Sequence, residues 1–383
     1  MFVESNNLSS IFINPAYSKM PSTNVVRLKN ASKPRIAVAG IGLIGQKHAQ
    51  VIANSPGTSL AALVDPRTET KRIAEQWGVN WYPSLPMMFS SEAPDGVVIS
   101  TPNTMHVEHG LQAINARCPM LIEKPIATST QEGELLLNAA RNSDVPVLVG
   151  HHRRHNPIIH SALQIIESGR LGKVRAVHLS TWFYKPDDYF AESTWRTMKG
   201  AGPIAVNLIH DIDLIRYLCG EITSVYAATS PSSRGFETED AAAAVFSFAS
   251  GAVGTLTLSD SIVAPWSWEM TAAENPAYPA TNQSCYWIGG THASLSLPDL
   301  TIWEQNGSRS WWKPLSATTE PRENTDPLYS QMSHFAKVIA REESPMVSAE
   351  EALSSLEVIE AIRNSARSGT SVELSGAYKS AIA

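Results

Sequence analysis

Short apolar runs alternate with segments of helical periodicity in the first part of the chain. The apolar runs lie at 35–39, 59–64, 96–100, 119–122 and 145–150. The helical segments lie at 44–54, 68–77, 105–116 and 129–142. Strands that alternate with helices in this way build a parallel, doubly wound sheet. Residues 34–152 are therefore predicted to form one α/β domain.

The pattern changes after residue 152. A helical segment at 158–168 ends at Gly169, and strand-like segments then follow without regularly alternating helices. They lie at 173–184, 224–229, 241–248, 252–258 and 293–297. Only Ala249-Ser250-Gly251 separates the third strand from the fourth, so this pair is predicted to be a hairpin in which Gly251 adopts a positive φ. Residues 153–374 are predicted to form an α+β domain with a mostly antiparallel sheet.

The two ends of the chain differ in character. Near the C-terminus, apolar residues recur at helical spacing, which predicts a helix whose apolar stripe packs against one of the cores. They are Ala352, Leu356, Ile359 and Ala366.

Residues 375–383 are expected to be a tail. Residues 1–33 are rich in Ser, Asn and Pro and lack the pattern of a secretory signal, so we expect a flexible extension, and the sequence leaves open whether Met20 is the natural start.

Composition narrows the class of protein. With 383 residues, 43% hydrophobic and 17% charged, the chain is long enough for two cores and has no apolar run that suggests a membrane span. A net charge of −6 and the lack of a dense basic cluster argue against a nucleic-acid partner. Three cysteines, Cys118, Cys219 and Cys285, are too few for a disulfide framework or a Cys-x-x-Cys metal site. Such cysteine usage fits a reducing compartment, so we expect a cytoplasmic protein.

A glycine motif follows the first apolar run directly and opens a helical segment. Gly40 permits a tight turn, Gly42 lets the backbone approach a pyrophosphate, and Gly45 lets the helix pack on the strand. The helix N-terminus, at Leu43 and Ile44, presents free N–H groups to phosphates. The alternative is an ordinary glycine-rich turn, but the strand and helix on either side favour a dinucleotide cradle.

An acidic residue stands where such a cradle needs one. Asp65 ends the second strand, 20 positions after Gly45, where a carboxylate accepts hydrogen bonds from ribose hydroxyls. Its charge disfavours a 2′-phosphate, so NAD is expected as the cofactor, although Arg67 leaves NADP open.

Two further groups of residues have candidate catalytic chemistry. Glu123-Lys124-Pro125 follows strand 119–122 at the carboxyl edge, where a desolvated Lys124 would exchange a proton with a substrate hydroxyl. The alternative is a surface lysine paired with Glu123. In the segment 200–214, a glycine loop is expected to open a helix with Asn207, His210, Asp211 and Leu214 on one face. His210 is then an acid or base, or simply a satisfied histidine near a helix cap.

The run His151-His152-Arg153-Arg154-His155 joins the two predicted domains. A metal site is disfavoured, because consecutive histidines on a strand point to opposite faces and the arginines repel cations. A hinge with substrate or cofactor contacts is favoured, with His152 facing the cleft. Trp195, next to Arg196, is expected at the cleft mouth.

Together these motifs resemble the Gfo/Idh/MocA oxidoreductases, which include inositol, glucose–fructose and related sugar dehydrogenases. The resemblance extends from residue 34 to about residue 374 and rests on the glycine motif, Glu123-Lys124-Pro125, the stretch 200–213, and one further motif. That motif is Ser100-Thr101-Pro102-Asn103 with His106. The resemblance implies that this motif, Glu123 and Lys124 contact the cofactor, that Lys124 and His210 are catalytic, and that the Lys124–Pro125 bond is cis. It also implies a Rossmann domain joined to a domain with a large open sheet that makes homodimer or homotetramer contacts.

One position departs from the family pattern. Many of these sugar dehydrogenases carry an aspartate four residues before the histidine, where this chain has Val206. Asn207 is rotated by about 100° around a helix and cannot simply replace that carboxylate, so Asn207 and Asp211 are only candidate members of a proton relay. An acid from Asp187-Asp188 is a further candidate. The resemblance also places Thr181, Phe183 and His152 against the substrate, and Phe183 suggests a pocket less polar than an inositol enzyme needs.

The sequence therefore predicts an NAD(P)-dependent dehydrogenase or reductase. Hydride would move between nicotinamide and a secondary alcohol or ketone carbon of a sugar, cyclitol or related ring compound, and no metal is expected. Two alternatives stay open: a glycosidase that retains NAD and acts by transient oxidation, and a non-catalytic NAD-binding regulator.

Overall fold

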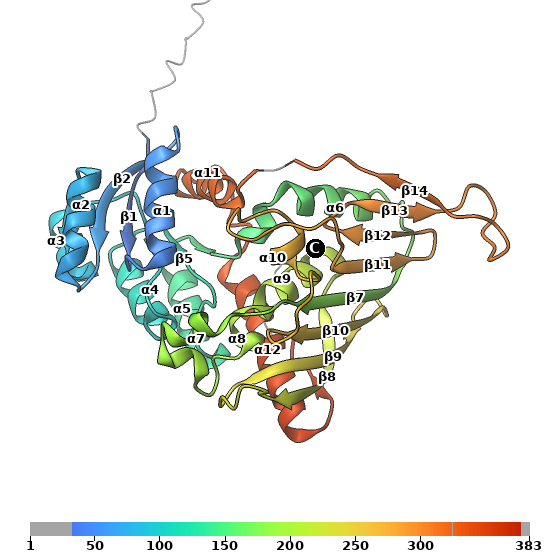
Figure 1. The fold of residues 1–383 in the computed structure, drawn as a ribbon. Helices are drawn as coiled ribbons and strands as arrows, with labels where there is room; N and C mark the ends of the chain where they lie inside the picture. Colours follow the sequence, from blue (N-terminus) through green and yellow to red (C-terminus); the bar gives the residue numbers. More distant parts are fainter. Residues whose placement is uncertain (1–32, 324, 377–383) are drawn as a thin grey trace, which may run out of the picture. The chain divides into compact units, whose positions relative to one another are not determined.

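The computed structural model describes residues 33–323 and 325–376, in two β-sheets with their helices (Figure 1). Most of the predicted extension and tail lies outside the described residues. The first sheet has six strands in the order β3-β2-β1-β4-β5-β6, and all of its pairings are parallel. Its strands are β1 Arg35–Ala39, β2 Ser59–Val64, β3 Asn80–Tyr82, β4 Gly96–Ile99, β5 Met120–Ile122 and β6 Val147–Val149. The predicted doubly wound sheet is confirmed.

Helices connect the strands of this first sheet. They are α1 Leu43–Asn54, α2 Lys71–Trp77, α3 Leu85–Ser91, α4 His106–Asn115 and α5 Thr130–Ser143. A helix from late in the chain, α11 Pro327–Ile339, contacts α1 (Figure 1). The strand β3 and the helix α3 were not predicted, because a three-residue edge strand that is only partly buried has no apolar run to mark it.

The second sheet has nine strands in the order β14-β13-β12-β11-β7-β10-β9-β8-β15. Only β7 and β10 pair in parallel, so the sheet is mixed and mostly antiparallel. Its longer strands are β7 Val174–Trp182, β8 Ile222–Pro231, β9 Glu239–Phe248 and β10 Val253–Ser259. Its shorter strands are β11 Tyr286–Gly290, β12 Ala293–Leu297, β13 Thr301–Glu304, β14 Ser316–Thr319 and β15 Val372–Glu373.

The predicted hairpin is present as β9 and β10, and Gly251 has a φ of 79°. Burial alternates along both strands, so one face of the sheet is packed and the other is open to solvent. The strands β11, β13, β14 and β15 were not predicted, since they are short and β14 is exposed along its whole length.

The helices of this second part pack on the sheet and on one another. They are α6 Pro157–Glu167, α7 Asp187–Ala191, α8 Pro203–Val206, α9 Leu208–Cys219, α10 Trp268–Thr271 and α12 Ala349–Ser368. The terminal helix α12 buries Ala352, Leu356 and Ile359 and contacts β8, α9 and α5. The predicted apolar stripe is therefore confirmed. It packs on a helix of the first sheet, α5, and on a strand and a helix of the second part, β8 and α9.

Within the segment 200–214, where a glycine loop was expected to open one helix, the structure has two helices. The helix is interrupted at Asn207, whose φ of −105° and ψ of −51° separate α8 from α9. Asparagine side chains compete with helical hydrogen bonding, and the Asn207 amide oxygen here accepts a hydrogen bond from Lys185.

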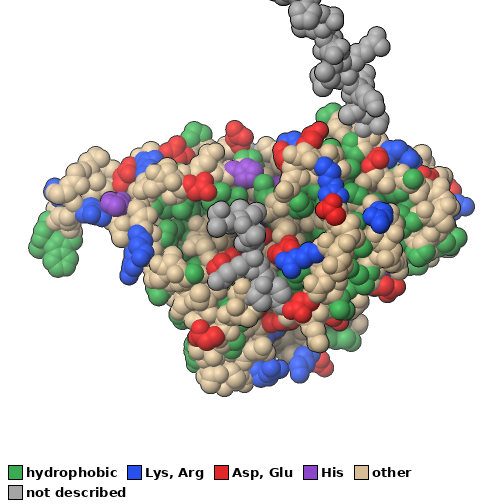
Figure 2. Space-filling view, turned by 180° about the vertical axis from the view of Figure 1, so that it is seen from behind, with side chains coloured by type: hydrophobic (Ala, Val, Ile, Leu, Met, Phe, Trp, Pro, Cys, Tyr) green, Lys and Arg blue, Asp and Glu red, His purple; other side chains and the backbone are tan. Residues whose placement is uncertain are grey.

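Within the described part of the chain, no helix is long and apolar enough to cross a membrane. On the face that Figure 2 shows, Lys and Arg side chains are interspersed with Asp and Glu side chains, without an extended area of one sign.

Candidate functional site

The glycine motif forms a tight loop between β1 and α1. Gly40 has a φ of 86°, and a Cβ at this residue would lie 2.6 Å from the carbonyl oxygen of Ser100. A Cβ at Gly45 would lie 1.8 Å from the carbonyl oxygen of Gly40, so neither position accepts a side chain. A Cβ at Gly42 would meet nothing within 4 Å, and the neighbouring Leu43 is 94% exposed. The loop is closely packed on the protein side and open on the other, which fits a bound dinucleotide.

Asp65 lies beside this loop, at the end of β2. Its carboxylate accepts hydrogen bonds from the Ile41 N–H at 2.8 Å and from the Arg67 guanidinium at 2.8 and 2.9 Å. Burial alone would raise the pKa of Asp65, but Arg67 and the two backbone N–H groups lower it, so the carboxylate is charged. Arg67 also donates to the Ile41 carbonyl, and the two side chains act together at this edge of the cradle.

The motif at 100–106 braces the loops of the cradle. The Ser100 hydroxyl contacts the carbonyl oxygens of Ala39 and Gly40 at 3.0 and 2.9 Å. The His106 ring is fully buried between the carbonyl oxygens of Pro125 and Thr101, at 2.7 and 2.9 Å. Ser100 and His106 thereby fix the backbone around the cofactor position, whereas Pro102 and Asn103 are exposed.

Glu123 is held by a histidine that the sequence did not single out. The Glu123 carboxylate lies 2.7 Å from Nε2 of His48, on α1, and both side chains are buried. Burial would raise the pKa of Glu123, but the hydrogen bond and charge of His48, with the charge of Lys124, lower it to about 2. The alternative of a Lys124–Glu123 ion pair is wrong, because Lys124 Nζ instead donates to the carbonyl oxygen of Val206 at 3.2 Å.

Lys124 follows β5, and the Lys124–Pro125 bond is cis, as the resemblance implied. Burial lowers the pKa of Lys124, and the charges of Arg153 and Lys185 act in the same direction. His210, on α9, has a pKa well below its usual value because burial disfavours the imidazolium and Lys124 and Arg153 repel it. The side chains therefore provide an amine of lowered basicity and a neutral imidazole.

The histidines at 151 and 152 both face His210. Their ring centroids lie 5.8 and 5.0 Å from that of His210. The expectation that they point to opposite faces was wrong, because the segment His152–His155 is a 3-10 helix and not a strand. Neither ring nitrogen of His151 has a hydrogen-bond partner in the described structure, and the same holds for Nδ1 of His210.

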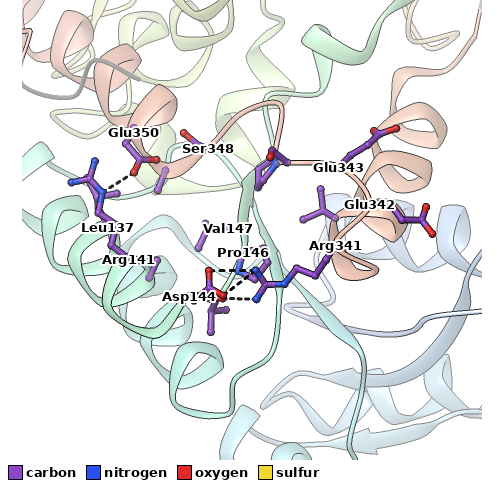
Figure 3. A pocket seen from close by; sticks show the side chains of 16 residues that line it. Leu137, Arg141, Asp144, Pro146, Val147, Arg341, Glu342, Glu343, Ser348 and Glu350 are labelled. Atoms are coloured by element: carbon purple, nitrogen blue, oxygen red, sulfur yellow. Dashed lines mark hydrogen bonds and ion pairs between the residues drawn. The ribbon is translucent and has the colours of Figure 1, made fainter. Parts of the chain in front are cut away.

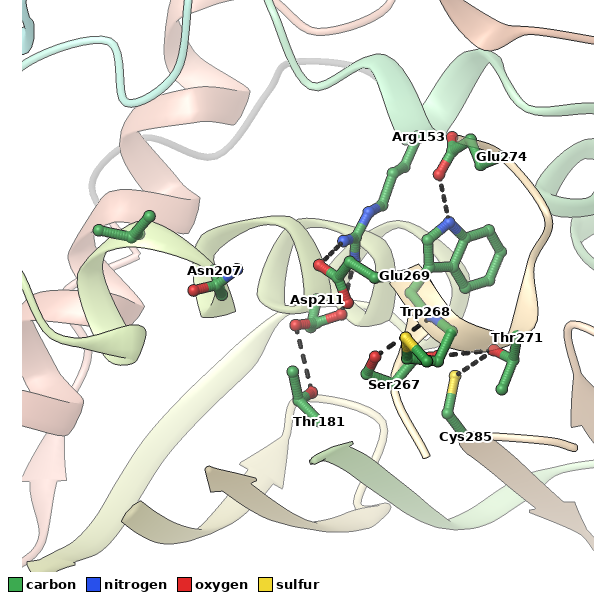
Figure 4. A network of polar contacts seen from close by, with 12 residues as sticks. Arg153, Thr181, Asn207, Asp211, Ser267, Trp268, Glu269, Thr271, Glu274 and Cys285 are labelled. Carbon is green, nitrogen blue, oxygen red and sulfur yellow. Dashed lines mark hydrogen bonds and ion pairs between the residues drawn. The ribbon is translucent and has the colours of Figure 1, made fainter. Parts of the chain in front are cut away.

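A buried network surrounds Asp211, which follows His210 directly on α9 (Figure 4). Arg153 donates to Asp211 at 2.8 Å and to Glu269, on α10, at 2.6 Å. Thr181 and the hydroxyl of Tyr286 also donate to Asp211. Burial raises the pKa of Asp211 to about 6. Among the described residues no hydrogen bond joins Asp211 to Lys124 or His210, so its geometry fits a supporting residue better than a proton relay.

A second lysine lies at the break between α8 and α9. Lys185 Nζ donates to the Asn207 amide oxygen at 2.8 Å and lies 3.2 Å from the Asp260 carboxylate. Thr181, Phe183 and Lys185 are buried, whereas Tyr184 between them is 48% exposed. The sequence analysis missed Lys185, although the two-residue period that places Thr181 and Phe183 on one face includes it.

Trp195 is 49% exposed, in a short 3-10 helix over Thr194–Thr197. Its neighbour Arg196 packs over the Tyr189 ring at 4.1 Å and pairs with Glu192. No described contact connects Trp195 with Lys124 or His210. Its place at a cleft mouth stays a prediction.

A hollow of about 550 Å³ lies elsewhere, at the start of β6 (Figure 3). Two ion pairs, Arg141–Glu350 and Arg341–Asp144, lie at its rim. Strand β6 begins here, so the hollow is at the amino edge of the first sheet, whereas the glycine loop and Lys124 are at the carboxyl edge. It is therefore separate from the candidate site. Among the described residues, no group of histidine, cysteine or acidic side chains is arranged to hold a metal.

Family models match most of the chain. Residues 34–151 match the oxidoreductase family with an NAD-binding Rossmann fold, and residues 159–296 match the GFO/IDH/MocA C-terminal domain. Among characterised relatives, scyllo-inositol 2-dehydrogenase (NAD(+)) from Bacillus subtilis is 27% identical over 89% of this chain and 96% of its own length. D-apiose dehydrogenase from Paraburkholderia graminis is 25% identical over 92% of this chain and 91% of its own length.

Solved structures share the fold at low sequence identity. An oxidoreductase from Agrobacterium radiobacter in complex with NAD⁺, L-tartaric acid and magnesium has a TM-score of 0.74 at 18% identity, covering 89% of this chain and 98% of that one. The WlbA dehydrogenase from Bordetella pertussis in complex with NADH and UDP-GlcNAcA has a TM-score of 0.72 at 22% identity, covering 89% and 99%. With both family models matched in order, this chain belongs to the Gfo/Idh/MocA family of NAD-binding oxidoreductases.

Proposed function

We propose that this protein is an NAD-dependent dehydrogenase or reductase of a sugar, cyclitol or related ring compound. The observation that carries the proposal is the contact of Lys124 with Val206. It brings an amine from the carboxyl edge of the first sheet, beside the dinucleotide loop, to the helix pair that carries His210. Relatives named as dehydrogenases of scyllo-inositol and D-apiose support the substrate class.

Lys124 and His210 are proposed to have different roles in the reaction. When bound, NAD supplies the hydride acceptor or donor at its nicotinamide ring. Lys124, whose pKa is lowered by burial, takes the hydroxyl proton at Nζ when the substrate is oxidised and returns it when a ketone is reduced. The neutral His210 orients the same oxygen through a ring nitrogen. His152, Thr181 and Phe183 are proposed to border the substrate, with Asn207 beside them.

The cradle is proposed to hold NAD in preference to NADP. Asp65 is charged and faces the loop where the adenosine ribose would lie, so a 2′-phosphate would meet a like charge. Arg67 offsets part of that repulsion. Measuring the dissociation constants of both cofactors tests the preference, and tighter NADP binding would contradict it.

The assembly and location also belong to the proposal. We propose a homodimer or homotetramer built on the open face of the second sheet, which carries half-exposed Tyr226, Val245 and Val253. We further propose a cytoplasmic enzyme with a domain boundary at residues 152–153. Light scattering of the purified protein gives the subunit count.

The test is NADH formation by purified protein with a panel of aldoses, cyclitols and hydroxylated ring acids. Net NADH with one class, lost in Lys124→Met while NAD is still bound, supports the proposal. Unchanged turnover in that variant contradicts the role of Lys124. Release of sugar from a glycoside without net NADH would instead indicate a glycosidase, and bound NAD without any turnover a regulator.

A further inference from the structure

Two lysine amines meet at the junction of α8 and α9. Lys124 Nζ donates to the carbonyl of Val206 at 3.2 Å, and Lys185 Nζ donates to the side chain of the next residue, Asn207, at 2.8 Å. The lysines come from different parts of the chain, one after β5 and the other just after β7. Their charges are close enough for Lys185 to lower the pKa of Lys124.

Direct ion pairs do not match every positive charge at this junction, although the charges of Glu123 and Glu269 also act on Lys124. Among the described residues Lys124 has no ion pair, because its hydrogen-bond acceptor is a neutral carbonyl. Lys185 pairs with Asp260, but the same carboxylate also pairs with Arg234, at 3.0 Å. One carboxylate is thus shared by two cations, so neither Lys185 nor Arg234 has Asp260 as an ion-pair partner of its own.

Hydrogen-bond donors are also in excess. The Asn207 amide oxygen is occupied by Lys185, which leaves the amide nitrogen as the free end of the side chain, and that nitrogen has no partner among the described residues. An ammonium has three N–H groups, and the described contacts of Lys185 engage two of them, with Asn207 and Asp260. The Nζ of Lys124 has a single described hydrogen bond. A ligand at this junction must therefore bring acceptors.

One acceptor of the protein lies in the neighbouring network. Oε1 of Glu269 pairs with Arg153, whereas Oε2 is buried and has no hydrogen-bond partner in the described structure. The charge of Glu269 acts on both Lys124 and Lys185. An unpartnered carboxylate oxygen suits a ligand hydroxyl.

We propose that the substrate is a hydroxylated acid, with a carboxylate bound by Lys185 and the amide nitrogen of Asn207 and a hydroxyl directed to Glu269. A carboxylate supplies acceptors for the N–H groups that the described contacts leave without one, and charge-assisted hydrogen bonds are the stronger kind. A neutral sugar supplies acceptors as well, but its hydroxyls form the weaker, uncharged kind of acceptor for an ammonium. This inference rests on the proposed function, because it names the substrate class of the same site.

The test compares binding of matched acids and neutral sugars to the protein saturated with NADH. Isothermal titration calorimetry would use D-glucuronate against D-glucose, D-galacturonate against D-galactose, and L-tartrate against erythritol. We expect the acid of at least one pair to bind at least tenfold more tightly than its neutral partner. Equal affinities in every pair, including no measurable binding by either member, would overturn the proposal.

Substitutions assign the effect to the junction. Lys185→Met is expected to remove the acid preference, and Lys185→Arg to retain part of it. Asn207→Asp introduces a like charge and is expected to weaken acid binding at least tenfold, which answers the question even if Lys185→Met fails to fold. Lys199→Met is the matched control, because Lys199 is an exposed lysine of the same region and its removal is expected to change nothing. An acid preference that survives in both Lys185→Met and Asn207→Asp would overturn the subsite.

A titration of NADH into the wild-type protein, made before the acids and sugars are added, separates this inference from the function on which it rests. Failure of the wild-type protein to bind NADH would contradict the proposed oxidoreductase itself. Tight NADH binding and turnover of a neutral sugar, without any preference for the acids, would leave the oxidoreductase standing and remove only the carboxylate subsite.

Discussion

Lys124 Nζ lies 3.2 Å from the carbonyl oxygen of Val206 and donates a hydrogen bond to it. Val206 is the last residue of α8, where helix carbonyls have no partner within the helix. The family resemblance stated from the sequence implied an aspartate at this position, and the charge of an aspartate there would stabilise the ammonium. A backbone carbonyl holds the amine in place without that charge. Burial is therefore the largest influence on the pKa of Lys124, and it lowers this pKa.

The rate of substrate oxidation should therefore depend on pH through Lys124. The neutral amine is the form that takes a proton, so kcat/KM for oxidation should rise with pH and level off above a pKa lower than the ordinary 10.5. Reduction should show the opposite dependence. Lys124→Met should lower kcat by about 10²–10⁴-fold without changing the NAD dissociation constant, as general acid–base catalysis of this size requires. A pH profile that keeps the same limb in Lys124→Met would contradict the assignment.

The glycine loop allows a sharper test with a matched control. Gly45→Ala places a methyl group 1.8 Å from the Gly40 carbonyl oxygen, so the loop or α1 must shift. We expect NAD affinity to fall at least tenfold and the protein to be destabilised by about 1–3 kcal/mol, the usual cost of overpacking. Gly57→Ala, where an added Cβ meets nothing within 4 Å, should leave both unchanged. Cofactor titration and urea unfolding measure the two effects, and equal behaviour of the two variants would contradict the steric argument.

Local patterns were sufficient for much of the fold. The apolar strands, the glycine loop and Asp65 follow from periodicity and short-range spacing, and the structure places Asp65 against the loop as expected. The interruption at Asn207 was not visible, because it accompanies a hydrogen bond to Lys185, 22 residues earlier in the chain.

The support of the candidate site was harder to anticipate for the same reason. Arg153 joins Asp211 and Glu269, which are 58 and 116 residues away, and no motif marks such pairs. Periodicity reports which face of an element is buried but not which buried charge meets which. The catalytic roles of Lys124 and His210 stay predictions that the measurements above address.

Low pH should lower the free energy of unfolding, because Glu123 becomes protonated. Its pKa is lowered from the ordinary 4.5 to about 2, so its ionised form stabilises the folded state above pH about 4.5, and this contribution is lost as the pH falls toward 2. The shift corresponds to about 3 kcal/mol. Glu123→Gln should therefore be less stable than the wild type at neutral pH, with the difference shrinking in acid. Urea unfolding at several pH values measures this, and a difference that stays constant across that range would contradict the linkage.

The buried pair of Arg154 and Asp213 should contribute far more to stability than an exposed pair of the same kind. Arg154 donates two hydrogen bonds to Asp213, at 2.8 and 2.7 Å, and the two side chains are 2% and 0% exposed. Arg154→Met leaves a buried carboxylate without its principal partner, which costs about 3–5 kcal/mol.

The exposed pair of Arg341 with Asp144 provides the control, since these side chains are 54% and 92% exposed. Arg341→Met should change the free energy of unfolding by less than about 1 kcal/mol. If denaturant unfolding gave similar losses for the two variants, burial would not be the reason for the strength of the Arg154 pair. Packing of Arg154 over the Tyr217 ring, at 4.7 Å, would then be the first contact to examine, with Tyr217→Leu as the variant.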